Sequence, residues 1–300
     1  MSVKGWLYRG EVWTLVLRFD DMGQEASHPR DGVSIQVIGA GLPRTGTTSL
    51  ALALQILFDG PVYDGGTQLW HGKPSDCTAL ISVLQKTPIR SASDKQYILN
   101  TLKQIFHGYV ATTDTPSAQF VPELLELWPD AKVICTVRDS DAWSRSIDQI
   151  VRASSTRSWF LRLVLFPLPG LRHFTTYVYA LQHGRWGELY VRPGDDITEY
   201  TRAWYDRHTE WLKSVVPREK LLFYDVRAGW QPLCEALGKE IPRDEGGKIL
   251  EFPKLNDARS ADDFAKQIVR KGLVAWAKIW GSVLAMGVGL YFGRLRWCWK

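Results

Sequence analysis

The segment from residue 34 to residue 57 constrains the fold more than any other part of the chain. Residues 34–39 read SIQVIG, a short apolar run ending in glycine, which is typical of a buried parallel strand. Residues 39–46 are rich in glycine and predict a turn. Residues 47–57, TTSLALALQIL, have helical composition with apolar side chains on all sides. The order is therefore strand, glycine loop and helix.

Two later segments repeat the alternation of strand and helix. KVICTV, residues 132–137, predicts a second buried strand, followed by a helix over about residues 141–152. KLLFY, residues 220–224, predicts a third, followed by a helix around residues 230–237. Such alternation favours an α/β fold with a mainly parallel central sheet flanked by helices.

Two interpretations of GAGLPRTGTTSL, residues 39–50, are disfavoured by single residues. Gly41 and Gly46 have the spacing of GxxxxGK[ST], but Thr47 stands where a P-loop nucleotidase needs lysine for the β- and γ-phosphates. The first two glycines of the dinucleotide fingerprint GxGxxG are also present, but Arg44 replaces the third. Ordinary nucleotide hydrolysis and NAD binding are thus weakly supported.

The same loop offers several donors to an anion. The backbone N–H groups of residues 45–48 precede or begin the predicted helix, where the helix dipole attracts negative charge. Arg44 adds a permanent charge that can bridge phosphate and sulfate oxygens. PRTGTT, residues 43–48, resembles the PxxGTT loop of sulfotransferases, which wraps the 5′-phosphosulfate of 3′-phosphoadenosine 5′-phosphosulfate. The resemblance implies that this donor is bound by Arg44, Thr45, Gly46, Thr47 and Thr48, although the family often has lysine in place of Arg44.

A second motif follows the 132–137 run. Sulfotransferases bind the 3′-phosphate of the donor with an arginine that ends a central strand and a serine eight residues later, and Arg138 and Ser146 have that spacing. Taken alone, Arg138 is better explained by a salt bridge to Asp141, and Ser146 by a solvated helix face. With the loop upstream in the family's order, the resemblance implies that both residues bind the 3′-phosphate.

More narrowly, the chain resembles a fungal-type family of sulfotransferase-like P-loop proteins over about residues 33–260. This resemblance implies a three-layer P-loop fold. Members are often labelled NAD-dependent epimerases or dehydratases, a label that the loop chemistry does not support. Asp64 stands where histidine is common in that family. The resemblance rests on VIGAGLPRTGTTSL (37–50), GPVYDGGTQ (60–68), DAKVICTVRD (130–139), YDVRAGWQPLCEALG (224–238) and FPKLND (252–257).

The transferred group needs charge stabilisation, and the acceptor hydroxyl needs a base. Cytosolic sulfotransferases use a histidine before the strand that carries the 3′-phosphate arginine, and here Asp114, which follows the strand-like residues 108–113, occupies about that place. Burial would raise the pKa of such a carboxyl into a useful range. The alternative is that Asp114 caps the helix following Thr115 and Pro116. Arg44 and Asp114 are the catalytic candidates, with His107 as a second candidate base and His71 as a candidate for the acceptor pocket.

These motifs predict transfer of a sulfuryl group to a hydroxyl of a small molecule or lipid. Two alternatives remain open: a non-catalytic, membrane-associated nucleotide-binding protein, and an NAD-dependent epimerase or dehydratase. No metal is required, and the net charge of +5 does not by itself argue for nucleic acid. The four cysteines are far apart, which gives no disulfide framework or metal spacing and favours a reducing compartment.

The C-terminal tail, residues 261–300, contains a long apolar run. Residues 272–293 read GLVAWAKIWGSVLAMGVGLYFG, about one bilayer thickness of helix with one charge at Lys278. We expect a membrane anchor here, with the catalytic domain facing the cytosol, although a buried amphipathic helix of the domain would also fit. The segment from residue 159 to residue 181, rich in aromatic residues and leucine, is expected to be a lid or an acceptor-pocket insertion.

The N-terminal extension, residues 1–32, carries no convincing secretory signal. MGQEAS, residues 22–27, matches the N-myristoylation pattern MGxxxS, which would act only if translation began at Met22. The composition, with 45% hydrophobic and 23% charged residues, is that of an ordinary globular protein.

Overall fold

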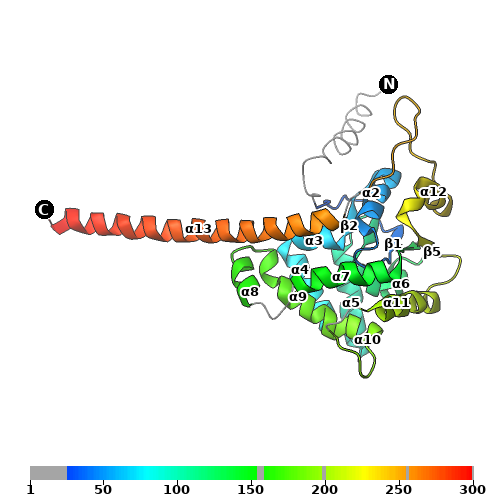
Figure 1. Ribbon diagram of the computed structural model, residues 1–300, viewed down its shortest axis with the longest axis horizontal. Helices are drawn as coiled ribbons and strands as arrows, with labels where there is room; N and C mark the ends of the chain where they lie inside the picture. Colours follow the sequence, from blue (N-terminus) through cyan, green and yellow to red (C-terminus); the bar gives the residue numbers. More distant parts are fainter. Residues whose placement is uncertain (1–25, 154–158, 198–200, 255–256, 299–300) are drawn as a thin grey trace.

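A parallel sheet forms the centre of the computed structural model, which describes residues 26–153, 159–197, 201–254 and 257–298 (Figure 1). Its strand order is β2-β3-β1-β4-β5, and every neighbouring pair is parallel. Val37 in β1 is in register with Ala111 of β3 on one side and with Lys132 of β4 on the other. The strands are β1 (Val37–Gly39), β2 (Val62–Asp64), β3 (Ala111–Thr113), β4 (Lys132–Thr136) and β5 (Leu221–Tyr224).

Helices cover both faces of this sheet. The α-helices are α2 (Thr47–Phe58), α3 (Gly65–His71), α4 (Pro74–Leu84), α5 (Ala92–Ile105), α6 (Val121–Leu127), α7 (Ser140–Ala153), α8 (Trp159–Leu165), α9 (Phe174–Leu181), α10 (Gly187–Tyr190), α11 (Arg202–Val215), α12 (Trp230–Leu237) and α13 (Asp257–Cys298). Four shorter turns join them: the 3₁₀ turns η2 (Ser117–Gln119), η3 (Leu171–His173) and η5 (Val226–Ala228), and the π-helical turn η4 (Gln182–Trp186).

Alternate strand residues enter two different hydrophobic clusters. Ile38 and Val133 belong to the cluster that contains residues of α4, α5, α6 and α11. Val37 and Ile134 belong to the cluster that contains residues of α2 and α12. Because successive side chains of a strand point to opposite faces, the sheet is the middle of three layers. The predicted α/β fold is therefore confirmed, and the strand at residues 62–64 is an addition to the strands expected from the sequence.

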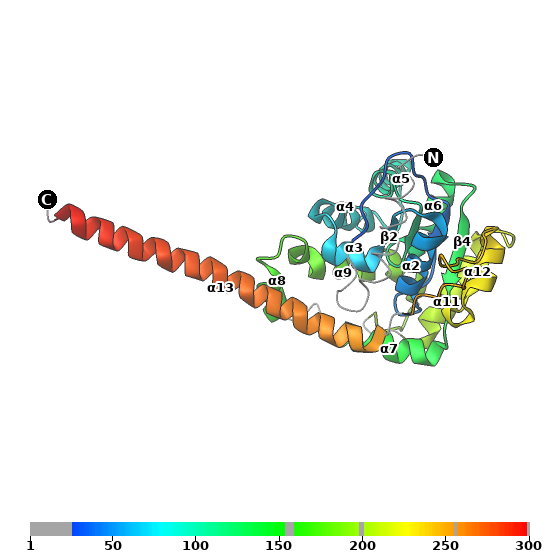
Figure 2. The ribbon, with the colours of Figure 1, turned by 90° about the horizontal axis from the view of Figure 1, so that it is seen from above.

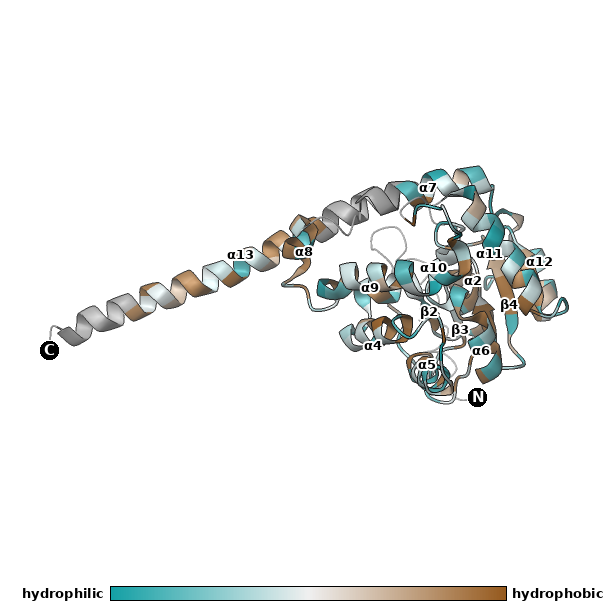
Figure 3. Ribbon diagram, turned by 90° about the horizontal axis from the view of Figure 1, so that it is seen from below, coloured by the Kyte–Doolittle hydropathy of each residue, from teal (hydrophilic) through white to brown (hydrophobic). Residues whose placement is uncertain are grey.

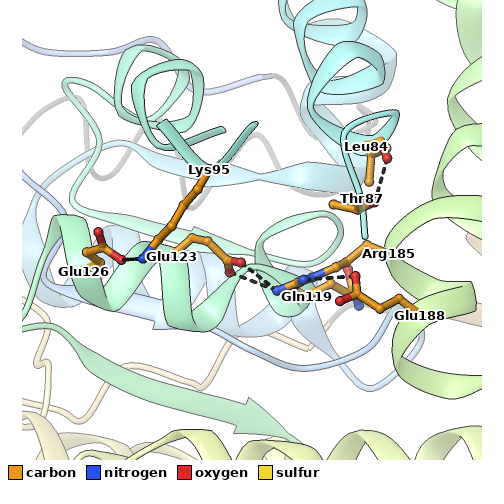
Figure 4. Close-up of polar contacts among 8 residues, drawn as sticks. All are labelled: Leu84, Thr87, Lys95, Gln119, Glu123, Glu126, Arg185 and Glu188. Carbon is orange, nitrogen blue, oxygen red and sulfur yellow. Dashed lines mark hydrogen bonds and ion pairs between the residues drawn. The ribbon is translucent and has the colours of Figure 1, made fainter. Parts of the chain in front are cut away.

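A buried ion pair fixes η4 to α6 (Figure 4). Nη2 of Arg185 donates to both carboxylate oxygens of Glu123, at 2.8 and 3.1 Å, and Nε donates to the backbone carbonyl of Gln119 at 2.9 Å. Nη1 also reaches Glu188 at 3.1 Å. Arg185 and Glu123 are almost fully buried, so the pair depends on these hydrogen bonds to replace water.

The C-terminal helix α13 extends out from the domain, as Figures 1 and 2 show from two directions. It has 42 residues, and the stretch Val269–Leu290 is long and apolar enough to cross a membrane, with none of its apolar window buried inside the structure. The alternative of a buried amphipathic core helix is therefore wrong. The predicted apolar run, residues 272–293, overlaps most of this stretch.

The segment from residue 159 to residue 181 folds as α8, η3 and α9. Leu165, Leu171 and Phe174 form a small hydrophobic cluster against which Leu69 and Trp70 of α3 pack. The segment therefore lies beside α3, and its helix α8 packs against α13 at Val164 and Gly272. Residues 1–25, including the predicted myristoylation pattern around Met22, lie outside the described residues.

Candidate functional site

The loop that joins β1 to α2 is held tightly against the end of β4. The N–H of Ala40 donates to the carbonyl of Ile134 at 2.8 Å. A Cβ at Gly41 would lie 1.9 Å from Oγ1 of Thr136, so only glycine fits there. Oγ1 of Thr45 lies 2.7 Å from the carbonyl oxygen of Leu42, to which it donates, and 2.5 Å from Oγ1 of Thr136. These contacts fix the path of the backbone before α2 begins.

The start of α2 has the features of an anion-binding helix terminus. Gly46, with a φ of 95°, is the residue before the helix, and no described side chain caps it. The first turn contains no acidic residue. Thr47 and Thr48 contribute hydroxyls in this turn, Thr48 being half-buried. The helix dipole and the first backbone N–H groups therefore favour an anion at this point.

Three of the predicted donor-binding residues meet beside this helix terminus. Nε of Arg44 donates to Oγ of Ser146 at 3.0 Å, and a guanidinium nitrogen of Arg138 donates to the backbone carbonyl of Arg44 at 2.8 Å. Arg138 follows β4 and Ser146 lies on α7. The fold thus brings two residues to Arg44 that are 94 and 102 positions away from it in the sequence. Nε1 of Trp143 donates to the carbonyl of Pro43 at 2.8 Å, which fastens α7 to the loop.

The alternative contacts considered for Arg138 and Ser146 are not formed. Asp141 pairs with Arg202 at 3.7 Å, and no ion pair between Asp141 and Arg138 occurs among the described residues. Ser146 is half-buried and hydrogen-bonded to Arg44, which is more than a solvated helix position requires. The two arginines therefore bring two positive charges to this loop, which favours an anion there.

Asp114 follows β3 and lies against the first turn of α2. Its Oδ2 accepts a hydrogen bond from the hydroxyl of Thr47 at 2.9 Å, and its Oδ1 accepts one from the N–H of Thr115 at 2.6 Å. The residue has a φ of 66°, in the left-handed region. The following turn η2 has Pro116 as its N-cap and no side-chain cap. The capping role considered for Asp114 is therefore not what the structure shows.

Burial is the main cause that raises the pKa of Asp114 to about 7, and the neighbouring charge of Asp64 is the second. Hydrogen bonds from Thr115 and Thr47 act in the opposite direction and lower this pKa. Asp64 ends β2 and caps α3, accepting hydrogen bonds from the hydroxyls of Thr67 at 2.6 Å and of Thr113 at 2.8 Å. A Cβ at Gly66 would lie 3.5 Å from Oδ2 of Asp114 and 3.8 Å from Oδ2 of Asp64. The two carboxyl groups thus face the same turn of α3.

The two histidines proposed from the sequence are not brought to this place. His107 is exposed and precedes β3, at the edge of the sheet opposite to the loop. His71 is exposed at the last residue of α3, whose first residues lie near Asp114. His107 is therefore wrong as a second candidate base at this site, and the predicted role of His71 in an acceptor pocket stays a prediction.

One buried contact behind the loop was not predicted from the sequence. His208 on α11 is fully buried, and its Nε2 donates to the carbonyl of Ala40, at the start of the loop, at 2.7 Å. Since a carbonyl can only accept, Nδ1 is the acceptor from the hydroxyl of Tyr190, 2.7 Å away. Burial lowers the pKa of His208 to about 4, which keeps the ring neutral. No motif marked these residues, because their pairing depends on the packing of α10 and α11.

Comparison with known proteins assigns the family. A sequence model of the sulfotransferase domain matches residues 36–261, well over half of the chain. The chain belongs to the sulfotransferase family. Its sequence is also similar to that of the Ava biosynthesis cluster protein M of Aspergillus versicolor, with 29% identity over 219 residues that cover 70% of this chain and 79% of the relative. The resemblance inferred from residues 37–50 and 130–139 is thereby confirmed at the level of family.

Proposed function

We propose that this sulfotransferase-family protein transfers a sulfuryl group from 3′-phosphoadenosine 5′-phosphosulfate to a hydroxyl of a small molecule or lipid. The observation that carries the proposal is the convergence of Arg44, Arg138 and Ser146 beside the uncapped start of α2. The backbone N–H groups of residues 45–48 would hold the 5′-phosphosulfate, and Arg138 and Ser146 the 3′-phosphate. The same side chains suit a donor with two separate anionic groups better than a singly phosphorylated nucleotide.

Asp114 is the group that we assign as general base. The acceptor oxygen attacks the sulfur, the bond from sulfur to the donor phosphate oxygen breaks, and the acceptor proton passes to the carboxylate of Asp114. A pKa of about 7 matches this role, because the group is partly ionised near neutral pH and still takes up a proton. Arg44 would stabilise the charge that builds up on the departing phosphate.

We further propose that α13 anchors the protein to a membrane with its catalytic domain on the cytosolic side. The support is the length and apolar composition of Val269–Leu290, whose apolar window is not buried inside the structure. An acceptor that is a lipid or an amphiphile would be the most accessible substrate for a domain held at that surface.

The experiment is a transfer assay with donor labelled with ³⁵S in the sulfuryl group. The full chain is reconstituted in phospholipid vesicles with a panel of hydroxyl acceptors: a phenol, a primary alcohol, a sterol and a glycolipid. We expect label in at least one acceptor and release of 3′-phosphoadenosine 5′-phosphate in equal amount. Asp114→Asn should lower the rate by about 10²- to 10⁴-fold, the usual contribution of a general base.

Two controls separate the alternatives. Asp130→Asn changes a carboxylate before β4, at the opposite edge of the sheet, and should leave the rate unchanged. Binding of the product nucleotide without transfer to any acceptor or to water would favour the non-catalytic alternative. Binding of NAD⁺ in place of the sulfonucleotide would contradict the proposal and favour the epimerase or dehydratase interpretation.

A further inference from the structure

The short helix α8 exposes large apolar side chains on the side that faces away from the domain. Four residues are about half exposed or more: Trp159 (73%), Phe160 (52%) and Leu163 (49%) on α8, and Phe166 (60%), which directly follows it. Trp159, Leu163 and Phe166 are spaced by four and three residues, which places them on one side of the helix, and Phe160 borders them. The opposite side, with Val164 and Leu165, is buried. A soluble surface rarely gathers side chains of this size within two turns, so the patch indicates a partner.

The patch is attached directly to α13. A Cβ at Gly272 would lie 2.4 Å from the carbonyl oxygen of Val164, so glycine lets the two helices approach closely. Nε1 of Trp276 donates to the carbonyl of Leu163 at 2.7 Å, and its ring stacks on that of Phe166 with centroids 6.2 Å apart. Figure 3 shows α8, coloured as strongly hydrophobic, lying alongside α13. The exposed apolar surfaces of the two helices are therefore continuous.

The point of attachment defines a depth. Gly272 and Trp276 follow Val269, the first residue of the apolar stretch of α13, by three and seven residues. With a rise of about 1.5 Å per residue, α8 meets α13 about 5 to 10 Å inside this stretch. That distance is the depth to which an interfacial helix buries its apolar face, about 5 to 10 Å into the boundary between headgroups and acyl chains.

The charges around the patch have one sign. Residues 159–173 and 269–290 contain no aspartate or glutamate. They contain basic residues that are exposed: Arg162, Arg172, Arg270, Lys271 and Lys278. Basic side chains beside exposed aromatic and aliphatic residues are the composition that binds an anionic lipid surface. The long stem of Lys278 also lets its ammonium reach back toward the headgroups.

We infer that α8 is a second membrane-binding element, which lies in the boundary between headgroups and acyl chains of an anionic phospholipid bilayer while α13 crosses it. This inference rests on the membrane association proposed above. The hydrophobic cluster of Leu165, Leu171 and Phe174 connects α8 to α3, whose first turn faces Asp114. A bilayer-bound α8 therefore holds the catalytic edge at the membrane surface, where acceptors that partition into lipid are concentrated.

The test places a fluorescent NBD group on α8 of the full chain. Phe160→Cys is combined with Cys298→Ser, because Cys77, Cys135 and Cys234 are buried and react slowly. The protein is reconstituted in vesicles of phosphatidylcholine and phosphatidylserine. We expect emission shifted to the blue, strong quenching by a nitroxide placed near the headgroup on a lipid chain, and weak quenching by aqueous iodide.

Two matched positions give the scale. Met286→Cys labels the apolar stretch of α13, where the residue is 63% exposed, and Tyr97→Cys labels α5, where the residue is 40% exposed. The label at position 97 should be quenched by iodide and not by the lipid nitroxide. The label at position 286, which lies 17 residues beyond Val269, should be shielded from iodide and quenched by a nitroxide on a lipid chain.

The outcomes distinguish the two proposals. Protection at position 286 with iodide quenching at position 160 would overturn the role of α8 and leave membrane association intact. Iodide quenching at both positions would contradict membrane association itself. Shielding of position 160 from iodide and from every lipid nitroxide would show that protein covers α8, as in a second copy of the chain, and would also overturn the inference.

Discussion

The edge of the sheet that carries the candidate site differs from the outer side of α8 and α13 in what it buries and what it exposes. At the sheet edge, polar groups such as Thr45, Thr47 and Asp114 are buried, and each has a hydrogen-bond partner within the chain. Along α8 and α13, large apolar groups such as Trp159 and Leu290 are exposed. A buried polar group is stabilised by its internal partners, whereas an exposed apolar patch calls for a partner outside the chain.

The two regions obtain their stability in different ways. Substitution of a buried polar residue leaves its partner without a hydrogen bond inside the protein, and the domain loses stability. Substitution of an exposed apolar residue removes little packing, so the isolated domain is unaffected and only the external contact weakens.

The largest effect is expected at the buried ion pair of Figure 4. Glu123→Ala leaves the charge of Arg185 buried without a carboxylate partner, apart from the half-exposed Glu188, and should lower the free energy of unfolding by about 3–5 kcal/mol. Lys95→Ala is the matched control, since its pair with Glu126 is half exposed and should contribute about 0–1 kcal/mol. Urea denaturation measures both, and equal losses would contradict the comparison.

A smaller effect is expected behind the loop. Tyr190→Phe removes the donor to Nδ1 of the buried His208 and should cost about 1–3 kcal/mol of unfolding free energy. Tyr179→Phe, at an exposed tyrosine, should cost nothing measurable. The pKa of His208 is lowered to about 4, so the folded protein holds this ring neutral. Its contribution to stability is therefore complete above about pH 6.5 and is lost as the pH falls through 4. Thermal melts between pH 4 and 7 test this dependence.

A change in pH profile is expected from the carboxyl pair. If Asp114 is the base, transfer rises with pH through about 7, where this residue ionises. Asp64→Asn removes a negative charge that raises the pKa of Asp114, so the rise should move to lower pH. Because the pKa of Asp114 is raised, the stability contributed by its protonated form is complete below about pH 3.9 and is lost as the pH rises through 7. An unchanged dependence of the transfer rate on pH in Asp64→Asn would contradict the influence of Asp64 on the pKa of Asp114.

The smallest effect on stability is expected on α8. Phe160→Ser should change the free energy of unfolding by no more than about 0.5 kcal/mol, since the side chain is half exposed. Val164→Ser, at the buried side of the same helix, is the matched substitution and should be clearly destabilising. Denaturation of both variants in detergent gives the contrast, and similar losses would mean that Phe160 packs inside the protein.

The sequence predicted the elements that have a strong period or a sharp boundary. The expected helices at 47–57, 141–152 and 230–237 correspond within a residue to α2, α7 and α12. The strand β2 was missed, because three residues between Pro61 and Gly65 are too short to show a period. The length of α13 exceeded the expected apolar run because its polar first turns carry no hydrophobic signal.

The candidate site was predictable where contacts follow from a motif. Arg138 and Ser146 were paired by their spacing, and the structure places them beside Arg44 as the family order implies. The contact from His208 to Ala40 spans 168 positions and depends on how α11 packs, which no local pattern reports. For Asp114 the local pattern pointed equally to a helix cap, and only its left-handed backbone turns the carboxylate toward Thr47.

The most direct test of the donor site compares 3′-phosphoadenosine 5′-phosphate with adenosine 5′-phosphate by titration calorimetry. We predict tighter binding of the bisphosphate, and loss of that preference in Arg138→Ala by about 1.5–3 kcal/mol, the contribution of a hydrogen bond to a charged group. Arg218→Ala, the same charge change before β5 at the opposite edge, should retain the preference. Equal affinity for the two nucleotides, or a preference that survives Arg138→Ala, would contradict the assignment of Arg138 to the 3′-phosphate.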